Sequence, residues 1–249
     1  MNWSILGWGM ISVAIILLVV FTFRFKNGKS YKVRKNTQIE GLNTSRIAKI
    51  EGGLHRTIVL GHQLSSSAYP GLGLNSLAIV PGILDPETLA DGKLNISTSQ
   101  GSLMVFVRQI VENSYQNGFS KALTQRGVNT VLPGPTVYSN IAGLVCELGV
   151  HPQHGLILAG NFGPEVSLLS EVCVSKNGDV FAAAGTITSQ AALFPQVENL
   201  VMGENNFMLP GLLTPSPGRD AGWLTEDILR ILLIFMIIAA AILKMVGVL

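Results

Sequence analysis

Short apolar runs alternate with helical patterns through the middle of the chain. The clearest example is residues 155–172, GLILAGNFGPEVSLLSEV, where an apolar run at 156–159 meets a turn at 160–164 and then apolar residues at helical spacing. Pro164 suits the first helical turn, because its missing N–H would have no partner there in any case. This order of strand, tight turn and helix is the unit of a parallel sheet.

More copies of this unit are expected on either side of it. Strands are predicted at 55–64, 77–80, 94–97, 130–132, 180–184 and 200–202, and helices at 101–117, 136–148 and 187–198. A short amphipathic helix fits residues 36–51, a helical turn fits 86–90, and 205–213 show no clear pattern. Because strands and helices alternate at the spacing of βαβ crossovers, the sequence predicts an α/β fold. Its sheet should be doubly wound, mostly parallel and Rossmann-like, with helices on both faces.

Two apolar segments lie at the ends of the chain, at 4–23 and 228–249. The first has no charged residue from Ile5 to Phe23, and a membrane-spanning helix needs about 20 residues. A cleaved signal peptide is disfavoured for it, since no basic region precedes the apolar run. The second segment is a span or else a buried or interfacial helix. We expect a span, because its apolar residues surround the whole helix and Arg230 and Lys244 can extend outward.

A basic cluster directly follows the first apolar segment and consists of Arg24, Lys26, Lys29, Lys32, Arg34 and Lys35. Positive charges beside a span stay in the cytoplasm. The sequence therefore predicts a two-pass protein of the cell membrane with both termini outside. Residues 24–54 should form a basic juxtamembrane segment and linker, 55–213 a cytoplasmic α/β domain, and 214–227 a second linker.

The composition limits which classes of partner the protein can have. Of the 249 residues, 48% are hydrophobic and only 13% are charged, about half the charged share of soluble domains. The net charge of +2 is too small to indicate a nucleic-acid partner. Cys146 and Cys173 both lie in apolar helical patterns, so we expect reduced core thiols and no disulfide.

Candidate chemistry lies at the carboxyl ends of the predicted strands, where ligands bind in doubly wound sheets. The tentative ligand-binding residues in these turns are Ser99, Asn161, Glu165, Thr186, Ser189 and Glu204. As a pair, Glu165 and Glu204 could act as acid and base or hold a cation. Helix N-caps and the helix dipole explain the same residue types, so purely structural roles stay open.

Other motifs are missing or incomplete. The chain has neither a phosphate-binding G-x-x-x-x-G-K-[ST] loop nor a G-x-S-x-G nucleophile elbow. Residues 71–76, GLGLNS, only partly match a dinucleotide fingerprint and precede a strand-like run. His151 and His154 flank a proline and have no cysteine or carboxylate cluster nearby. We therefore expect no catalytic residue, no metal and no cofactor.

Two stretches carry a resemblance to a known family: AGNFGPEVSLLSE at 159–171 and AAAGTITSQAALFPQVENLVMGENNF at 182–207. With the terminal span entered through a short polar linker, they resemble a family of uncharacterised bacterial membrane-tethered proteins, a domain of unknown function. The resemblance extends over most of the chain from His55 onward. It implies a tethered Rossmann-like domain and no particular activity. Asn161 departs from the serine or similar small residue expected there.

These features favour a membrane-anchored, non-catalytic module that self-associates or organises a protein assembly at the cytoplasmic membrane face. Its partners would be the lipid bilayer and further copies of the chain or other membrane proteins. Low charge suits protein interfaces, and the small residues at 239–241 suit close helix packing. The alternative is a small-molecule-binding or enzymatic domain that uses the C-terminal edge of the sheet.

Overall fold

A computed structural model describes residues 15–24, 26, 55–61, 70–84, 94–116, 128–150, 155–203, 205–214 and 216–245. The chain divides into two compact units. Residues Asn36–Thr214 form the α/β unit, and Met1–Lys35 together with Pro215–Leu249 form the terminal unit. The α/β unit ends one residue after the predicted end at 213, and it begins at Asn36 instead of the predicted residue 55.

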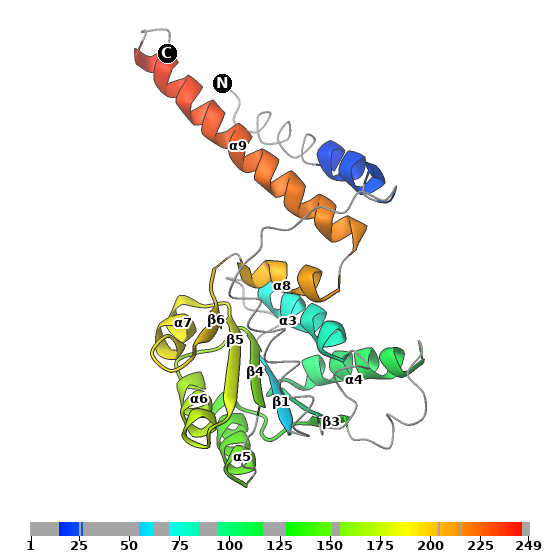
Figure 1. The fold of residues 1–249 in the computed structure, drawn as a ribbon, viewed down its shortest axis with the longest axis vertical. Helices are drawn as coiled ribbons and strands as arrows, with labels where there is room; N and C mark the ends of the chain where they lie inside the picture. The colour runs from blue at the N-terminus through cyan, green and yellow to red at the C-terminus, as the bar shows by residue number, and fades with distance from the viewer. Residues whose placement is uncertain are drawn as a thin grey trace. The chain divides into compact units, whose positions relative to one another are not determined.

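A six-stranded sheet is the centre of the α/β unit (Figure 1). Its strands are β1 (Arg56–Leu60), β2 (Leu94–Ser97), β3 (Val128–Val131), β4 (Gly155–Gly160), β5 (Asp179–Ala184) and β6 (Asn199–Val201). Their order in the sheet is β3-β2-β1-β4-β5-β6, and every neighbouring pair is parallel. This confirms the α/β prediction and the Rossmann-like sheet. The strand order reverses between β1 and β4, which makes the carboxyl ends of these two strands the topological switch point.

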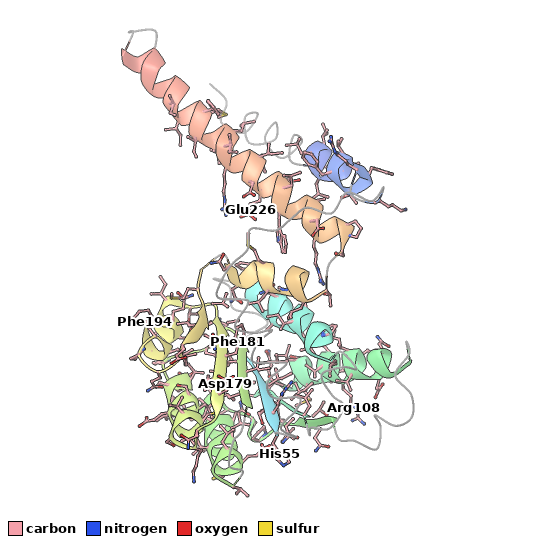
Figure 2. All side chains as sticks on the ribbon, viewed as in Figure 1. His55, Arg108, Asp179, Phe181, Phe194 and Glu226 are labelled. Atoms are coloured by element: carbon pink, nitrogen blue, oxygen red, sulfur yellow. The ribbon has the colours of Figure 1, made fainter. Side chains whose placement is uncertain are left out.

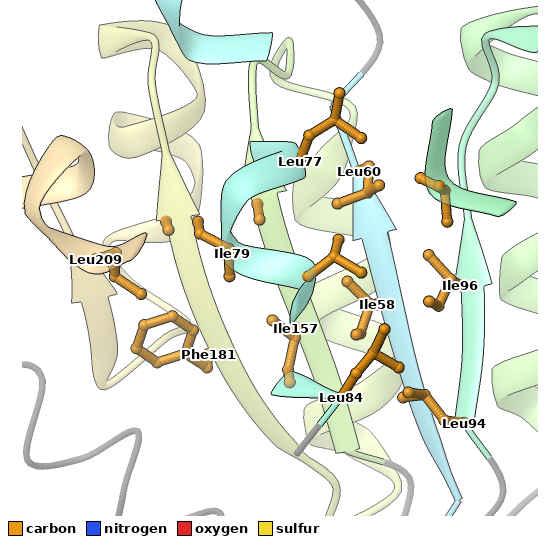
Figure 3. Close-up of a cluster of buried hydrophobic side chains, with 14 of the residues drawn as sticks. Ile58, Leu60, Leu77, Ile79, Leu84, Leu94, Ile96, Ile157, Phe181 and Leu209 are labelled. Atoms are coloured by element: carbon orange, nitrogen blue, oxygen red, sulfur yellow. The ribbon is translucent and has the colours of Figure 1, made fainter. Parts of the chain in front are cut away.

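Helices cover both faces of the sheet (Figure 1). One face packs against α3 (Pro70–Ile83), α4 (Gly101–Gln116) and α8 (Asn205–Leu213), and the other packs against α5 (Val137–Val150), α6 (Val166–Ser175) and α7 (Ile187–Leu193). Ile58 and Leu60 of β1 point into the first core, which Figure 3 shows, and Val59 points into the second. Because strands with two buried faces favour apolar residues throughout, β4 is almost entirely apolar and β1 is apolar from Ile58 to Leu60. Phe181 is buried in the sheet, whereas Phe194, just after α7, is 69% exposed at the outer side (Figure 2).

The prediction that differs most from the structure is the strand at 77–80, because these residues lie inside helix α3. Leu77, Ile79 and Val80 are all buried, because α3 packs on the sheet and against α8. A helix segment whose residues are nearly all buried shows the same continuous apolar run as a buried strand. Pro81 is exposed within the helix, and the Leu84 N–H still donates to the Val80 carbonyl at 3.0 Å.

The other elements differ from the prediction mainly at their ends. β2 has the predicted bounds, and α4 ends one residue early. α7 ends at Leu193, five residues before the predicted end at 198, with Phe194 as its C-cap and Pro195 immediately after the cap. Residues 205–213, which showed no clear pattern, form α8 with Pro210 inside it. The helices expected at 36–51 and 86–90 lie outside the described residues.

Both cysteines are free thiols. Cys173 is buried as expected, but Cys146 is exposed, so its assignment to the core was wrong. The reason is the helical phase of α5, which buries Ile141, Leu144 and Leu148 and leaves Cys146 on the opposite side.

In the terminal unit, residues 15–24 are helical, and 4–14 of the predicted first segment lie outside the described residues. The second helix, α9 (Pro217–Met245), begins well before the predicted span at 228. Most of the linker expected at 214–227 is therefore helix. Within the part of the chain that the structure describes, no helix combines the length and the apolar character needed to cross a membrane.

Candidate functional site

Two glycines bring the backbones of β1 and β4 together at the switch point. The Gly61 N–H donates to the Ala159 carbonyl at 2.9 Å, and a Cβ on Gly61 would lie 2.2 Å from the Asn161 nitrogen. Gly160 has a φ of +122°, a conformation that side-chain-bearing residues rarely adopt, and its carbonyl accepts from the Gly185 N–H at 2.9 Å. The ends of β1, β4 and β5 are thus joined by main-chain hydrogen bonds with no room for a side chain at Gly61.

Glu165 lies in the turn that follows β4, at the start of α6. Its Oε1 accepts from the Gly163 N–H at 2.8 Å, so the carboxylate folds back over its own turn. Asn161 begins this turn and is half-buried, with its main chain against Gly61. In this arrangement the Glu165 carboxylate stabilises the turn, which is the structural role that the sequence left open.

Thr186 and Ser189 form the N-terminal cap of α7. Thr186 Oγ1 accepts from the Ser189 N–H at 3.3 Å, and the Ser189 hydroxyl donates to the Thr186 carbonyl at 2.9 Å. Thr186 Oγ1 also donates to the carbonyl of Phe162 at 2.7 Å, which ties the turn after β4 to the start of α7. Both hydroxyls therefore have internal partners, as expected for N-cap residues.

The structure thus gathers four of the six candidate residues, Asn161, Glu165, Thr186 and Ser189, at the ends of β4 and β5. Ser99 is buried after β2, on the other side of β1 in the sheet. Glu204 lies outside the described residues, so the proposed pairing of Glu165 with Glu204 stays a prediction. No group of His, Cys, Asp or Glu side chains that could hold a metal ion is found within the described ranges.

Buried amides near the switch point were not predicted. Asn206, in the first turn of α8, is 1% exposed, and neither its Nδ2 nor its Oδ1 has a hydrogen-bond partner among the described residues. The Asn75 side chain donates to the Asn206 carbonyl at 2.7 Å, and the adjacent Ser76 lies against Gly160. An unpaired buried amide is unfavourable, so it indicates a place where a polar molecule would be stabilised. The sequence places Asn206 after a strand but contains no signal for its burial.

A second buried amide lies on the opposite face of the sheet. Ser97 of β2 donates to Asn140 Oδ1 at 3.3 Å, and Asn140 Nδ2 has no partner in the described part of the chain. Asn95 of the same strand donates to Glu147 of α5. These contacts fix α5 to the sheet through polar groups as well as through its apolar face.

No family model, characterised protein or solved structure matches the chain. The resemblance to bacterial membrane-tethered proteins therefore stays a prediction that rests on residues 159–171 and 182–207.

Proposed function

We propose that the protein is a membrane-anchored, non-catalytic module that self-associates or organises a protein assembly at the cytoplasmic face of the cell membrane. The observation that carries this proposal is the exposed apolar surface of α9. Its large apolar side chains are between 42% and 68% exposed at Ile231, Leu233, Ile234, Phe235, Met236, Ile237 and Ile238. Successive helical residues point about 100° apart, so the run from 233 to 238 exposes apolar groups on every side. A helix of this kind is stable only where lipid or partner helices cover it.

The helix at 15–24 has the same character. Its large apolar side chains are between 45% and 67% exposed at Ile15, Ile16, Leu18, Val19, Val20 and Phe23. Covering the exposed half of such a side chain contributes about 1 kcal/mol, so the two helices together would gain on the order of 10 kcal/mol from an apolar environment. The basic cluster that begins at Arg24 supports the cytoplasmic placement of the α/β unit.

The internal bonds of the candidate residues support a non-catalytic role. Thr186, Ser189 and Glu165 each satisfy polar groups of their own turns, so their chemistry is used for the fold. If these side chains were catalytic, they would have to turn toward a substrate, and the main-chain N–H groups and carbonyls that they now pair with would lose their partners.

Thiol labelling tests the location of the α/β unit. Gln109 is exposed on α4, and Cys173 is 1% exposed. The double variant Cys146→Ser, Gln109→Cys therefore offers one accessible thiol, and Cys146→Ser alone is the matched control. In intact cells, a membrane-impermeant maleimide should leave the double variant unmodified, and permeabilisation should allow one label per chain. Labelling before permeabilisation would place the unit outside, and release of the protein by an alkaline carbonate wash would contradict the membrane anchor.

A second candidate function, small-molecule binding at the C-terminal edge of the sheet, is favoured by the buried amide of Asn206, which has no partner within the ranges that the structure describes. A ligand with a donor beside an acceptor would pair with both amide atoms. Native mass spectrometry of the purified full-length protein tests this candidate. A co-purifying small molecule that is lost in Asn206→Leu would support it, and identical spectra for both proteins would remove it.

A further inference from the structure

Helices α3 and α8 lie side by side and run in the same direction. Asn75 Nδ2 donates to the main-chain carbonyl of Asn206 at 2.7 Å, and a Cβ on Gly82 would lie 2.3 Å from the Cβ of Leu213. The second contact follows the first by seven residues in both helices, from 75 to 82 and from 206 to 213, which is about two helical turns. The first turn of α8 therefore lies against α3.

The Asn206 side chain is on the inward side of α8. Leu209 and Leu213, three and seven residues further on, pack in the first core, and Figure 3 shows Leu209 there. Residues at this spacing share one side of a helix. Asn206 is 1% exposed, and neither atom of its amide has a partner within the described ranges. A polar side chain therefore occupies the start of an otherwise apolar row.

The main chain of Asn206 is paired, whereas its amide is not. The Asn206 N–H donates to the Gly203 carbonyl at 3.3 Å, and the Asn206 carbonyl accepts from Asn75. A buried amide that lacks partners is less favourable than an apolar side chain of the same shape. The amide contributes no hydrogen bond to the described part of the fold, so it is suited to a bound molecule that pairs with it.

This amide lies at the carboxyl edge of the sheet. α8 begins at Asn205, four residues after β6 ends at Val201. The Cβ of Ser76 in α3 lies 3.2 Å from the position that a Cβ on Gly160 would take, and Gly160 is the last residue of β4. The start of α8 is thus connected through α3 to the switch point between β1 and β4, where doubly wound sheets bind ligands.

The charges at this edge favour a neutral ligand. In nucleotide-binding folds of this architecture, a phosphate binds the N–H groups where a helix follows a strand. After β4, that place is taken by the chain itself, because the Glu165 carboxylate accepts from the Gly163 N–H at 2.8 Å. The described residues of the turns that follow the strands include no Lys or Arg. An anionic ligand would therefore meet a carboxylate and no cation among these residues.

We propose that the buried amide of Asn206 binds a neutral, planar molecule that carries a donor beside an acceptor on one edge, as a nucleobase or a carboxamide does. Asn206 Oδ1 accepts from the donor of the ligand, and Nδ2 donates to its acceptor. This inference names the ligand class for the second candidate function above and rests on that candidate. It does not depend on the membrane anchor.

Equilibrium dialysis of the full-length protein in mild detergent tests the ligand class. The probes are adenosine and nicotinamide, which carry the required edge on a nucleobase and on a carboxamide. At least one should bind the wild-type protein with a Kd at least about tenfold lower than that for Asn206→Leu, the loss expected for a bidentate pair. Asn113→Leu, the same substitution at an exposed position of α4, is the matched control and should bind like the wild type.

Two further measurements separate the loss of these hydrogen bonds from a loss of the fold. In a Cys146→Ser background, Cys173, which is 1% exposed, should stay unreactive toward a thiol reagent in Asn206→Leu. With the unchanged wild-type protein, adenosine or nicotinamide dimethylated on the exocyclic or amide nitrogen lacks the donor. These compounds should bind at least about tenfold more weakly than their parents.

The charge of the ligand is tested with adenosine 5′-monophosphate. It should bind no more tightly than adenosine, because the described edge offers its phosphate no cation. Binding about tenfold tighter than that of adenosine would overturn the neutral class.

Equal binding of both probes to the wild type and to Asn206→Leu, or no binding to either protein, would overturn the proposed ligand class. If native mass spectra still show a co-purifying molecule that is lost in Asn206→Leu, the second candidate function stands and the ligand class is wrong. If no such molecule is found, both fail.

Discussion

Replacing Gly61 with alanine tests the close approach of β1 and β4 at the switch point. The new Cβ would lie 2.2 Å from the Asn161 nitrogen and 2.5 Å from its oxygen, whereas ordinary contacts begin at 3.4 Å. One of the two backbones must therefore move by about 1.2 Å, the difference between 3.4 and 2.2 Å. Because the obstructing atoms belong to the main chain, no side-chain rotation can relieve the overlap.

The expected loss of stability combines two effects. Overpacking of a well-packed site costs about 1–3 kcal/mol, and the shift breaks the hydrogen bond from the Gly61 N–H to the Ala159 carbonyl, about 1 kcal/mol more. We therefore expect Gly61→Ala to lower the free energy of unfolding by about 2–4 kcal/mol. Gly101→Ala is the matched control, since nothing lies within 4 Å of its Cβ position, and it should change stability by less than about 0.5 kcal/mol.

The buried thiol of Cys173 supplies the assay. In a Cys146→Ser background, modification of Cys173 in increasing urea reports the unfolding of the α/β unit specifically. For a urea dependence of about 2 kcal/mol per molar, Gly61→Ala should lower the midpoint by about 1–2 M. Equal midpoints for Gly61→Ala and Gly101→Ala would refute the backbone contact between the two strand ends.

Two further substitutions use the same urea assay. Thr186→Ala should lower the free energy of unfolding by about 2 kcal/mol, because it removes both the α7 cap and the hydroxyl bond to the Phe162 carbonyl. Thr186→Ser should keep most of the stability. Equal urea midpoints for the two variants would show that the hydroxyl has no such role. Asn206→Leu should leave stability within about 1 kcal/mol of the wild type or raise it, since it removes a buried amide that has no partner among the described residues. A large loss would mean that the amide holds a bound molecule.

The sequence predicts well those elements whose apolar pattern and flanking turns agree. β2, β4 and α4 fall within one or two residues of their predicted bounds: β4 is a short apolar run ended by the turn at 160–164, and α4 has apolar residues at helical spacing. Helix α3 was missed for the opposite reason. Its run of buried residues at 77–80 hides the helical period, and Pro81 and Gly82 resemble the end of a strand.

The start of α9 shows how the same residues can mark a linker or a helix. Residues 214–227 were predicted to be a linker, yet Pro217 is at the first helical position of α9, where its missing N–H is harmless. Ser216 precedes it and its carbonyl accepts from the Asp220 N–H at 3.1 Å, and Asp220 places a negative charge in the first turn. Ser-Pro followed by an acidic residue three positions later is thus a helix start that the linker reading overlooked.

The candidate site was predicted only as far as local chemistry determines it. Thr186 was predicted as a tentative ligand-binding residue with an N-cap role as the open alternative, and the structure shows it as the N-cap of α7. The hydrogen bond from the Gly163 N–H to the Glu165 carboxylate depends on the shape of one turn. The contact of Gly61 with Asn161 joins residues far apart in the chain and depends on the strand order, which no local pattern contains.

The central claim is that the protein is membrane-anchored and self-associating. The most direct test is the protein mass of the full-length chain, extracted from washed membranes in mild detergent and measured by light scattering with the detergent contribution subtracted. The account predicts a homogeneous species of at least twice the chain mass of 26.6 kDa. A homogeneous particle of a single chain, or recovery of the protein from the soluble fraction without detergent, would contradict it.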